Sequence, residues 1–261
     1  MKRTVRKVFG TFLAAAGGAL LMTAAPGCAE SESVLFIRQA QIPQQSSGGG
    51  CVYDSSASTS RFLSGVLDVS IRTQYTAGLL VGNQMVDRGS KDDLRTETSR
   101  VQLEGTEVYV KDASGNRIAG PYTVPGTGLV DPASGSNPSF GLITTVLIDS
   151  VTGSRLANDL AQLPYGTIRR LTSHVKVFGR TLGGTEVESG EWQFPIDVCY
   201  GCLVRFPTEA NNPNYDTPNC LNLSGESQLT TPCNPGQDDP IDCRVCKLVA
   251  SDPSVCEPSA G

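Results

Sequence analysis

Apolar and polar residues alternate with a period of two over residues 65–72 and again over residues 75–81. Because successive side chains of a strand point to opposite faces of a sheet, both stretches predict half-buried strands. In the first stretch the expected inner face holds Leu67, Val69 and Ile71, and the expected outer face holds Asp68 and Ser70.

The same pattern continues, with one reversal, through the centre of the chain. Val101 and Leu103 set a phase that Val108 and Val110 reverse around Gly105, as a β-bulge would produce. Residues 112–116 predict a turn, and further strands are expected at 142–149, 171–178 and 192–198. The glycine pair 183–184 predicts a hairpin turn between the last two of these strands. Pro195 has no N–H to donate, which places strand 192–198 at a sheet edge.

One helix interrupts the strands. Leu156, Leu160 and Leu163 recur at helical spacing, Thr152 or Ser154 is the expected N-cap, and Pro164 ends the helix. Many short strands and one helix of about two turns predict an all-β protein, an antiparallel β-sandwich of immunoglobulin or fibronectin type. The strand–bulge–strand order, the short helix and the segment 175–179 resemble the sandwich of late-embryogenesis-abundant and water-stress (WHy) domains. This resemblance implies a fold only.

The first 27 residues have the pattern of an export signal. Four cations, Lys2, Arg3, Arg6 and Lys7, precede an apolar run over residues 8–25. A membrane-anchoring helix is the alternative, but two glycines interrupt the run and an acidic segment follows it.

Cys28 follows this segment directly. The sequence Ala25-Pro26-Gly27-Cys28 resembles the lipobox of bacterial lipoproteins. The resemblance implies cleavage before Cys28 and attachment of diacylglycerol to its sulfur, and Ala29 in second place implies the outer membrane of a Gram-negative cell. Several acyl chains on one cysteine satisfy the requirement of stable membrane attachment for more than one lipid signal. The alternative is an ordinary secretory cut after Ala29, which would discard Cys28.

Charge changes the picture of the partners. Cleavage removes four of the 21 Lys and Arg residues and none of the 26 Asp and Glu residues, so the net charge moves from −5 to −9. An acidic surface without clustered cations argues against nucleic acid as a partner. The membrane, reached through the lipid, and an envelope protein or glycan are the expected partners.

Composition divides the mature chain into three parts. Residues 28–50 predict a lipidated tether with a possible first strand at 34–37, residues 51–198 the sandwich, and residues 199–261 a module that is poor in core-forming residues and rich in proline and cysteine. Such a module needs covalent cross-links to be ordered. The disulfide candidates are Cys51, Cys199, Cys202, Cys220, Cys233, Cys243, Cys246 and Cys256.

An even set of cysteines in an exported chain predicts four disulfides without fixing their partners. Because seven of the eight lie in the last part, full oxidation requires Cys51 to bridge to it. The two CxxC units, 199–202 and 243–246, leave zinc binding and thioredoxin-like exchange as alternatives. Their separation is too long for a zinc ribbon, and neither unit precedes a clear helix.

Candidate catalytic residues are scarce. His174 is the one histidine, and alternation places it with Thr172 and Lys176 on the solvent face of its strand. No nucleophile elbow, metalloprotease motif or phosphate loop is present, so neither a catalytic residue nor a cofactor is predicted. Asp238, Asp239 and Asp242 are weak candidates for calcium ligands, because hard carboxylate oxygens suit calcium but the same residues are ordinary in turns.

These features predict a lipid-anchored protein of the cell envelope with a non-catalytic binding or assembly role. The alternative function is an envelope hydrolase that acts on saccharide or peptidoglycan through paired carboxylates, since sequence does not show how far apart two acids lie.

Overall fold

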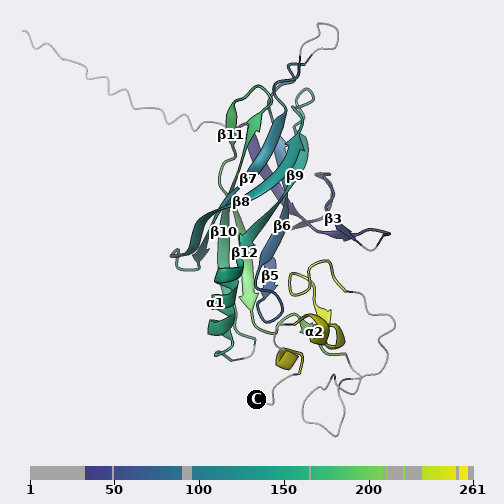
Figure 1. Cartoon of the computed structure of the whole chain (residues 1–261), viewed down its shortest axis with the longest axis vertical. Helices are drawn as coiled ribbons and strands as arrows, with labels where there is room; N and C mark the ends of the chain where they lie inside the picture. Colours follow the sequence, from purple (N-terminus) through teal and green to yellow (C-terminus); the bar gives the residue numbers. More distant parts are fainter. Residues whose placement is uncertain are drawn as a thin grey trace, which may run out of the picture. The chain divides into compact units, whose positions relative to one another are not determined.

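Two β-sheets packed face to face form the body of the protein in a computed structural model (Figure 1). The structure describes residues 33–48, 50–89, 96–164, 166–207, 210, 220, 231–250 and 253–257. The expected signal peptide and Cys28 therefore lie outside the described residues. The described residues all belong to one compact unit, Ser33–Gly261.

The first sheet has four strands in the order β4-β1-β6-β9. These are β4 (Arg61–Phe62), β1 (Leu35–Gln41), β6 (Tyr75–Asn83) and β9 (Ser139–Ile148). All of their pairings are antiparallel. The apolar run expected as a possible first strand is thus strand β1, paired along β6.

The second sheet has the order β5-β12-β10-β7-β8, with β11 paired to the far end of β10. Its members are β5 (Gly65–Asp68), β12 (Trp192–Cys199), β10 (Ile168–Thr181), β7 (Val101–Asp112), β8 (Arg117–Val130) and β11 (Glu186–Glu188). Every pairing is antiparallel except that of β5 with β12. Two further small sheets pair β2 (Gln44–Gln45) with β3 (Cys51–Val52) and β13 (Val204–Arg205) with β14 (Ile241–Asp242).

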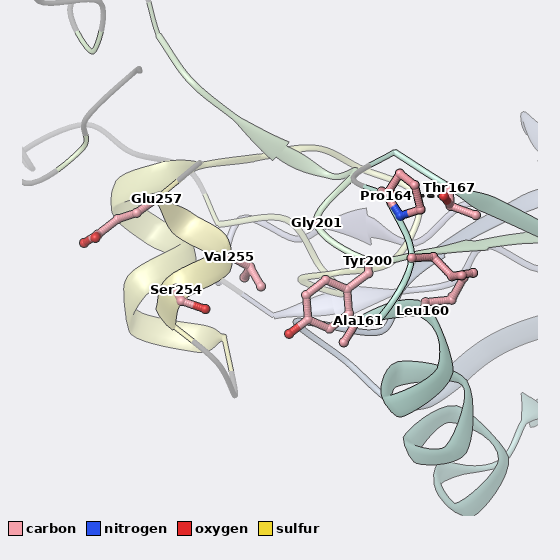
Figure 2. Close-up of a pocket in the computed structure, with 10 residues that line it drawn as sticks. Leu160, Ala161, Pro164, Thr167, Tyr200, Gly201, Ser254, Val255 and Glu257 are labelled. Atoms are coloured by element: carbon pink, nitrogen blue, oxygen red, sulfur yellow. Dashed lines mark hydrogen bonds between the residues drawn. The ribbon is translucent and has the colours of Figure 1, made fainter. Parts of the chain in front are cut away.

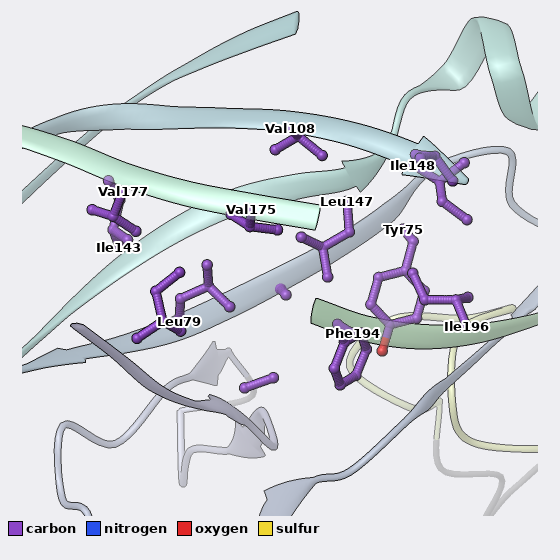
Figure 3. Close-up of a cluster of buried hydrophobic side chains, with 14 of the residues drawn as sticks. Tyr75, Leu79, Val108, Ile143, Leu147, Ile148, Val175, Val177, Phe194 and Ile196 are labelled. Carbon is purple, nitrogen blue, oxygen red and sulfur yellow. The ribbon is translucent and has the colours of Figure 1, made fainter. Parts of the chain in front are cut away.

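The inward residues of both sheets form one hydrophobic core. Phe194, Ile196 and Val198 of β12 face it together, as their alternation predicts. Figure 3 shows Phe194 and Ile196 beside Tyr75 of β6, with Val175 and Val177 of β10 further along the same layer. The all-β sandwich expected from the sequence is confirmed.

The register confirms two local predictions. The pairing of β7 shifts between Leu103 and Gly105, which is the bulge indicated by the reversed alternation. Asp112 then organises the turn to β8, because its backbone N–H donates to the Asn116 carbonyl and its carboxylate accepts from Ser114 N.

The predictions of the helix cap and of the edge position of strand 192–198 are wrong, and one strand is not predicted at all. Helix α1 spans Ser150–Leu160 and is capped by Asp149, whose carboxylate accepts from the N–H groups of Val151 and Thr152, so the cap is neither Thr152 nor Ser154. Strand β12 is central from Ile196 onward, where β5 begins to pair with it; Pro195 stands just before that pairing starts. Strand β8 was not expected, because Gly and Pro residues mask its pattern.

The last part of the chain folds against one end of the sandwich. Its described elements are β13, β14, α2 (Cys243–Val249) and a single turn, η2 (Pro253–Cys256). Around them a small second core gathers the buried cysteines with Ile71, Ile241 and Val255. Within the described ranges, no helix is long and apolar enough to cross a bilayer.

Candidate functional site

All eight cysteines proposed for disulfides are paired. The bridges are Cys51–Cys233, Cys199–Cys202, Cys220–Cys243 and Cys246–Cys256. The requirement that Cys51 bridge to the last part of the chain is confirmed, and its bridge closes a sequence separation of 182 residues. Because each sulfur is bonded to another sulfur, the two CxxC units do not form one metal-ligand set.

The loop that follows Cys233 packs against the sandwich and forms strand-like hydrogen bonds with it. The Asp68 N–H donates to the Gly236 carbonyl, and the Asp238 N–H donates to the Val66 carbonyl, both at 2.9 Å. The Gln237 side chain accepts from Thr76 N and donates to Thr76 O, as a backbone amide would. This loop therefore covers the outer edge of β5.

Asp238 completes the docking with a buried carboxylate. It accepts from the Tyr75 hydroxyl at 2.9–3.0 Å and from Val66 N at 2.9 Å. Its φ of 65° lies in the left-handed region, which Asp and Asn tolerate better than other non-glycine residues. Burial raises the pKa of this carboxyl above its ordinary value of 3.8, which the hydrogen bonds oppose in part.

The raised pKa of Asp238 predicts a pH dependence of stability. The folded state holds the proton at pH values where the unfolded state has lost it, so the stabilisation is complete below pH 3.8 and is lost as pH rises through the folded-state pKa. Each unit by which the pKa is raised corresponds to about 1.4 kcal/mol. Asp238→Asn keeps the shape of the side chain and tolerates the same φ, but it has no carboxyl proton to lose. As the pH is raised, the free energy of unfolding of the parent should therefore fall relative to that of Asp238→Asn. Urea unfolding of both proteins from acid to neutral pH measures this, and parallel profiles would contradict it.

Asp68 holds the turn that leads from the sandwich into the cysteine-rich part. Its side chain is fully buried, and its carboxylate accepts from Gly201 N at 2.8 Å and Leu203 N at 2.9 Å. Ser70 donates to the same carboxylate from its hydroxyl at 2.6 Å. The expectation that Asp68 and Ser70 face solvent is wrong, because the last part of the chain folds over this face of β5.

A cleft opens beside that turn, between the end of α1 and η2 (Figure 2). It has a volume of about 390 Å³. Tyr200 lies across it, with Leu160 and Ala161 on the α1 side and Ser254 and Val255 on the η2 side. Leu163, Pro164 and Thr167 extend the α1 wall. The lining combines apolar side chains with the hydroxyl groups of Thr167, Tyr200 and Ser254, which suits contact with an aliphatic or aromatic group.

Disulfides constrain the Tyr200 segment and the η2 wall of this cleft. Tyr200 and Gly201 lie inside the ring closed by Cys199–Cys202, and Val255 precedes Cys256, which is bridged to Cys246. At the rim, Glu257 pairs with Lys247 at 3.4 Å, and Figure 2 shows its side chain directed away from Tyr200. A cleft with a covalently constrained wall and Tyr200 segment loses less conformational freedom there when it binds a partner.

His174 is buried, and the prediction that it lies exposed is wrong. It does occupy the outer face of β10, but only 6% of it is accessible, because Tyr109 stacks on it at 4.5 Å. Its Nδ1 lies 2.8 Å from Glu191 Oε1, and the Tyr109 hydroxyl donates to Glu191 Oε2 at 2.6 Å. The hydrogen bonds from Tyr109 and His174 lower the pKa of Glu191. Arg117 lies 4.8 Å above the Tyr109 ring, so the group forms one packed polar cluster.

The calcium candidates do not come together as one ligand set. Asp238 is engaged by Tyr75 and Val66, while Asp242 caps α2 and pairs with Arg244 at 2.8 Å. Among the described residues, the two groups with metal-ligand spacing are Asp68 with Cys199 and Cys202, and Asp242 with Cys220 and Cys243. Both contain cysteines that are held in disulfides, and neither contains Asp238 or Asp239.

The acidic groove on the outer face of the second sheet bears on the hydrolase alternative. It has a volume of about 600 Å³ and is lined by Glu104, Glu107, Glu186 and Glu188. Cations pair with three of these carboxylates: Arg180 with Glu186 and Glu104, and Lys176 with Glu188. These pairs are solvent-exposed, which is typical of a charged sheet face.

The sequence predicts the cysteines of the site but not Asp68, Gln237 or the cleft. Alternation assigns Asp68 to the solvent face, and no local signal shows that a distant segment buries it. Comparison with family models, curated proteins and solved structures gave no match to this chain.

Proposed function

We propose that this protein is an exported, lipid-anchored component of the cell envelope that binds a partner protein and catalyses no reaction. The observation that carries the proposal is the cleft beside Tyr200, in which disulfides constrain the Tyr200 segment and the η2 wall. Disulfides persist in oxidising compartments, which supports export. The lipid anchor rests on the resemblance around Cys28.

The chemistry of the cleft favours a protein partner. Its walls of Leu160, Leu163 and Val255 and its Tyr200 ring offer a pocket for one aliphatic or aromatic side chain. Large apolar side chains inserted in a preformed pocket dominate the energetics of many interfaces. The Ser254 and Thr167 hydroxyls add polar contacts at its edge.

The hydrolase alternative finds less support in the geometry. It needs one protonated and one ionised carboxyl group facing a common space. Asp238 is the described carboxyl group with a raised pKa, and Tyr75, Val66 and Gln237 hold it inside the docked loop. The carboxylates of the open acidic groove are largely paired with cations instead.

Site-specific photo-crosslinking in intact cells tests the proposal. A photoreactive residue at Leu163, at the cleft, should give a discrete adduct with an envelope protein, and Tyr200→Ala should abolish that adduct. The matched control is the same residue at Leu63, an exposed leucine away from the cleft. Equal adducts from both positions, or turnover of an envelope polysaccharide that a single Asp or Glu substitution removes, would contradict the proposal.

A further inference from the structure

We propose that the end of the sandwich formed by Val86, Leu129 and Leu182 contacts the lipid bilayer, so that the Tyr200 cleft at the opposite end faces away from the membrane. We call this end the loop end. The inference rests on the lipid anchor of the proposed function and adds an orientation and a membrane-contact surface to it.

The chain enters the sandwich at the loop end. Ser33 Oγ lies within hydrogen-bond distance of the carbonyl oxygens of Leu35 and Glu188. Next to it, the Gln84 N–H donates to the Val34 carbonyl at 2.9 Å. Glu188 ends β11, which is the return strand of the hairpin that turns at residues 181–185. The first described residues are therefore fixed beside that hairpin.

The length of chain before Ser33 limits how far this end can lie from the anchored sulfur. Five peptide steps join Cys28 to Ser33, and five residues span at most about 18 Å when fully extended. Strand β10 has 14 residues and runs from the α1 end to the loop end. A strand of that length spans about 46 Å. When β10 runs along the membrane normal with the loop end at the bilayer, the cleft at its other end is therefore farther from the membrane than the anchor segment can span.

Three large apolar side chains project from neighbouring segments at the loop end. Val86 is 71% exposed, Leu129 is 59% exposed and Leu182 is 52% exposed. Backbone contacts connect the segments that carry these side chains. The Leu182 N–H donates to the Arg100 carbonyl. Leu129 of β8 pairs with Gln102 of β7, and Val86 forms a β-bridge with Ala133. Exposed apolar residues beside a lipid-bearing terminus can enter the bilayer interface, where their burial is favourable.

One exposed leucine at the other end of the molecule allows a comparison. Leu248 of α2 is also exposed, at 83%, but it lies in the part of the chain that folds at the opposite end of the sandwich (Figure 1). It therefore provides a matched control.

Tryptophan quenching in the full lipidated protein tests the orientation. The variants Leu182→Trp and Leu248→Trp are each incorporated into vesicles of phosphatidylcholine and phosphatidylglycerol with brominated acyl chains, and the parent, whose only tryptophan is Trp192, sets the baseline. The Leu182→Trp emission should shift to the blue and lose intensity relative to the parent. The Leu248→Trp emission should show neither change.

The outcomes separate this inference from the proposed function. A protein that carries acyl chains and floats with the vesicles, but shows no quenching at position 182 or stronger quenching at position 248, overturns the orientation and leaves the anchor intact. A protein without acyl chains that stays in solution overturns both. A second variant, Val86→Trp, repeats the test at another position of the loop end.

Discussion

Replacing Cys51 and Cys233 together with alanine is expected to lower the free energy of unfolding by about 5 kcal/mol, according to the chain-entropy model for a loop of this length. The bridge closes a separation of 182 residues and fixes the loop that brings Gln237 and Asp238 to β5 and β6. Removing both cysteines avoids leaving a free thiol. Urea unfolding followed by Trp192 fluorescence measures the change.

The matched control is the alanine pair at Cys246 and Cys256, which opens a separation of only 10 residues. The same model gives roughly 3 kcal/mol for a loop of that length. A loss at Cys51 and Cys233 no greater than the loss in the control pair would show that the long bridge does not stabilise the sandwich.

Asp68→Ala is expected to destabilise the protein by about 3–5 kcal/mol, because a buried donor left without a partner costs about 1–3 kcal/mol. The substitution removes the acceptor of the Gly201 and Leu203 N–H groups and of the Ser70 hydroxyl. Because Gly201 lines the cleft, the variant should also weaken the Leu163 photo-crosslink.

Asp131→Ala is the control for this variant, since Asp131 is exposed and pairs with Arg100 at the surface. Surface substitutions of this kind usually change stability by less than about 0.5 kcal/mol. If Asp68→Ala matched this control in the free energy of unfolding, the account of Asp68 as the residue that holds the turn would be wrong.

The sandwich could be predicted from the sequence because its inner face is regular. Alternation over residues 75–81 and 192–198 arises from side chains that face one core, and the bulge at Gly105 leaves its own reversal in the pattern. These signals are local, and a sheet with one buried face preserves them.

Strand β8 shows that the local pattern of residues does not predict every strand. Pro121 and Pro125 would exclude a central strand, but β8 is at the edge of its sheet and pairs with β7 alone. Pro195 led to the wrong expectation that strand 192–198 lies at a sheet edge. One side of β12 lacks a paired strand only as far as Pro195, and β5 pairs with it from Ile196 onward. Proline shows where a ladder hydrogen bond is missing; it does not show how long the missing stretch is.

The site could not be predicted in the same way, because contacts between residues far apart in the sequence form it. The number of disulfides followed from an even count of cysteines, whereas their partners followed from the fold. His174 was assigned correctly to the outer face, but its burial comes from Tyr109 and Glu191 on neighbouring segments. Alternation indicates which face a residue occupies and leaves open what covers that face.

Intact-mass analysis of the mature protein, combined with thiol alkylation before and after reduction, tests the central claim most directly. A mature chain that begins at an acylated Cys28, with no alkylated thiol before reduction and eight after it, is the result expected from the lipid anchor and the four disulfides. A chain without acyl mass that carries several free thiols as isolated would contradict the claim.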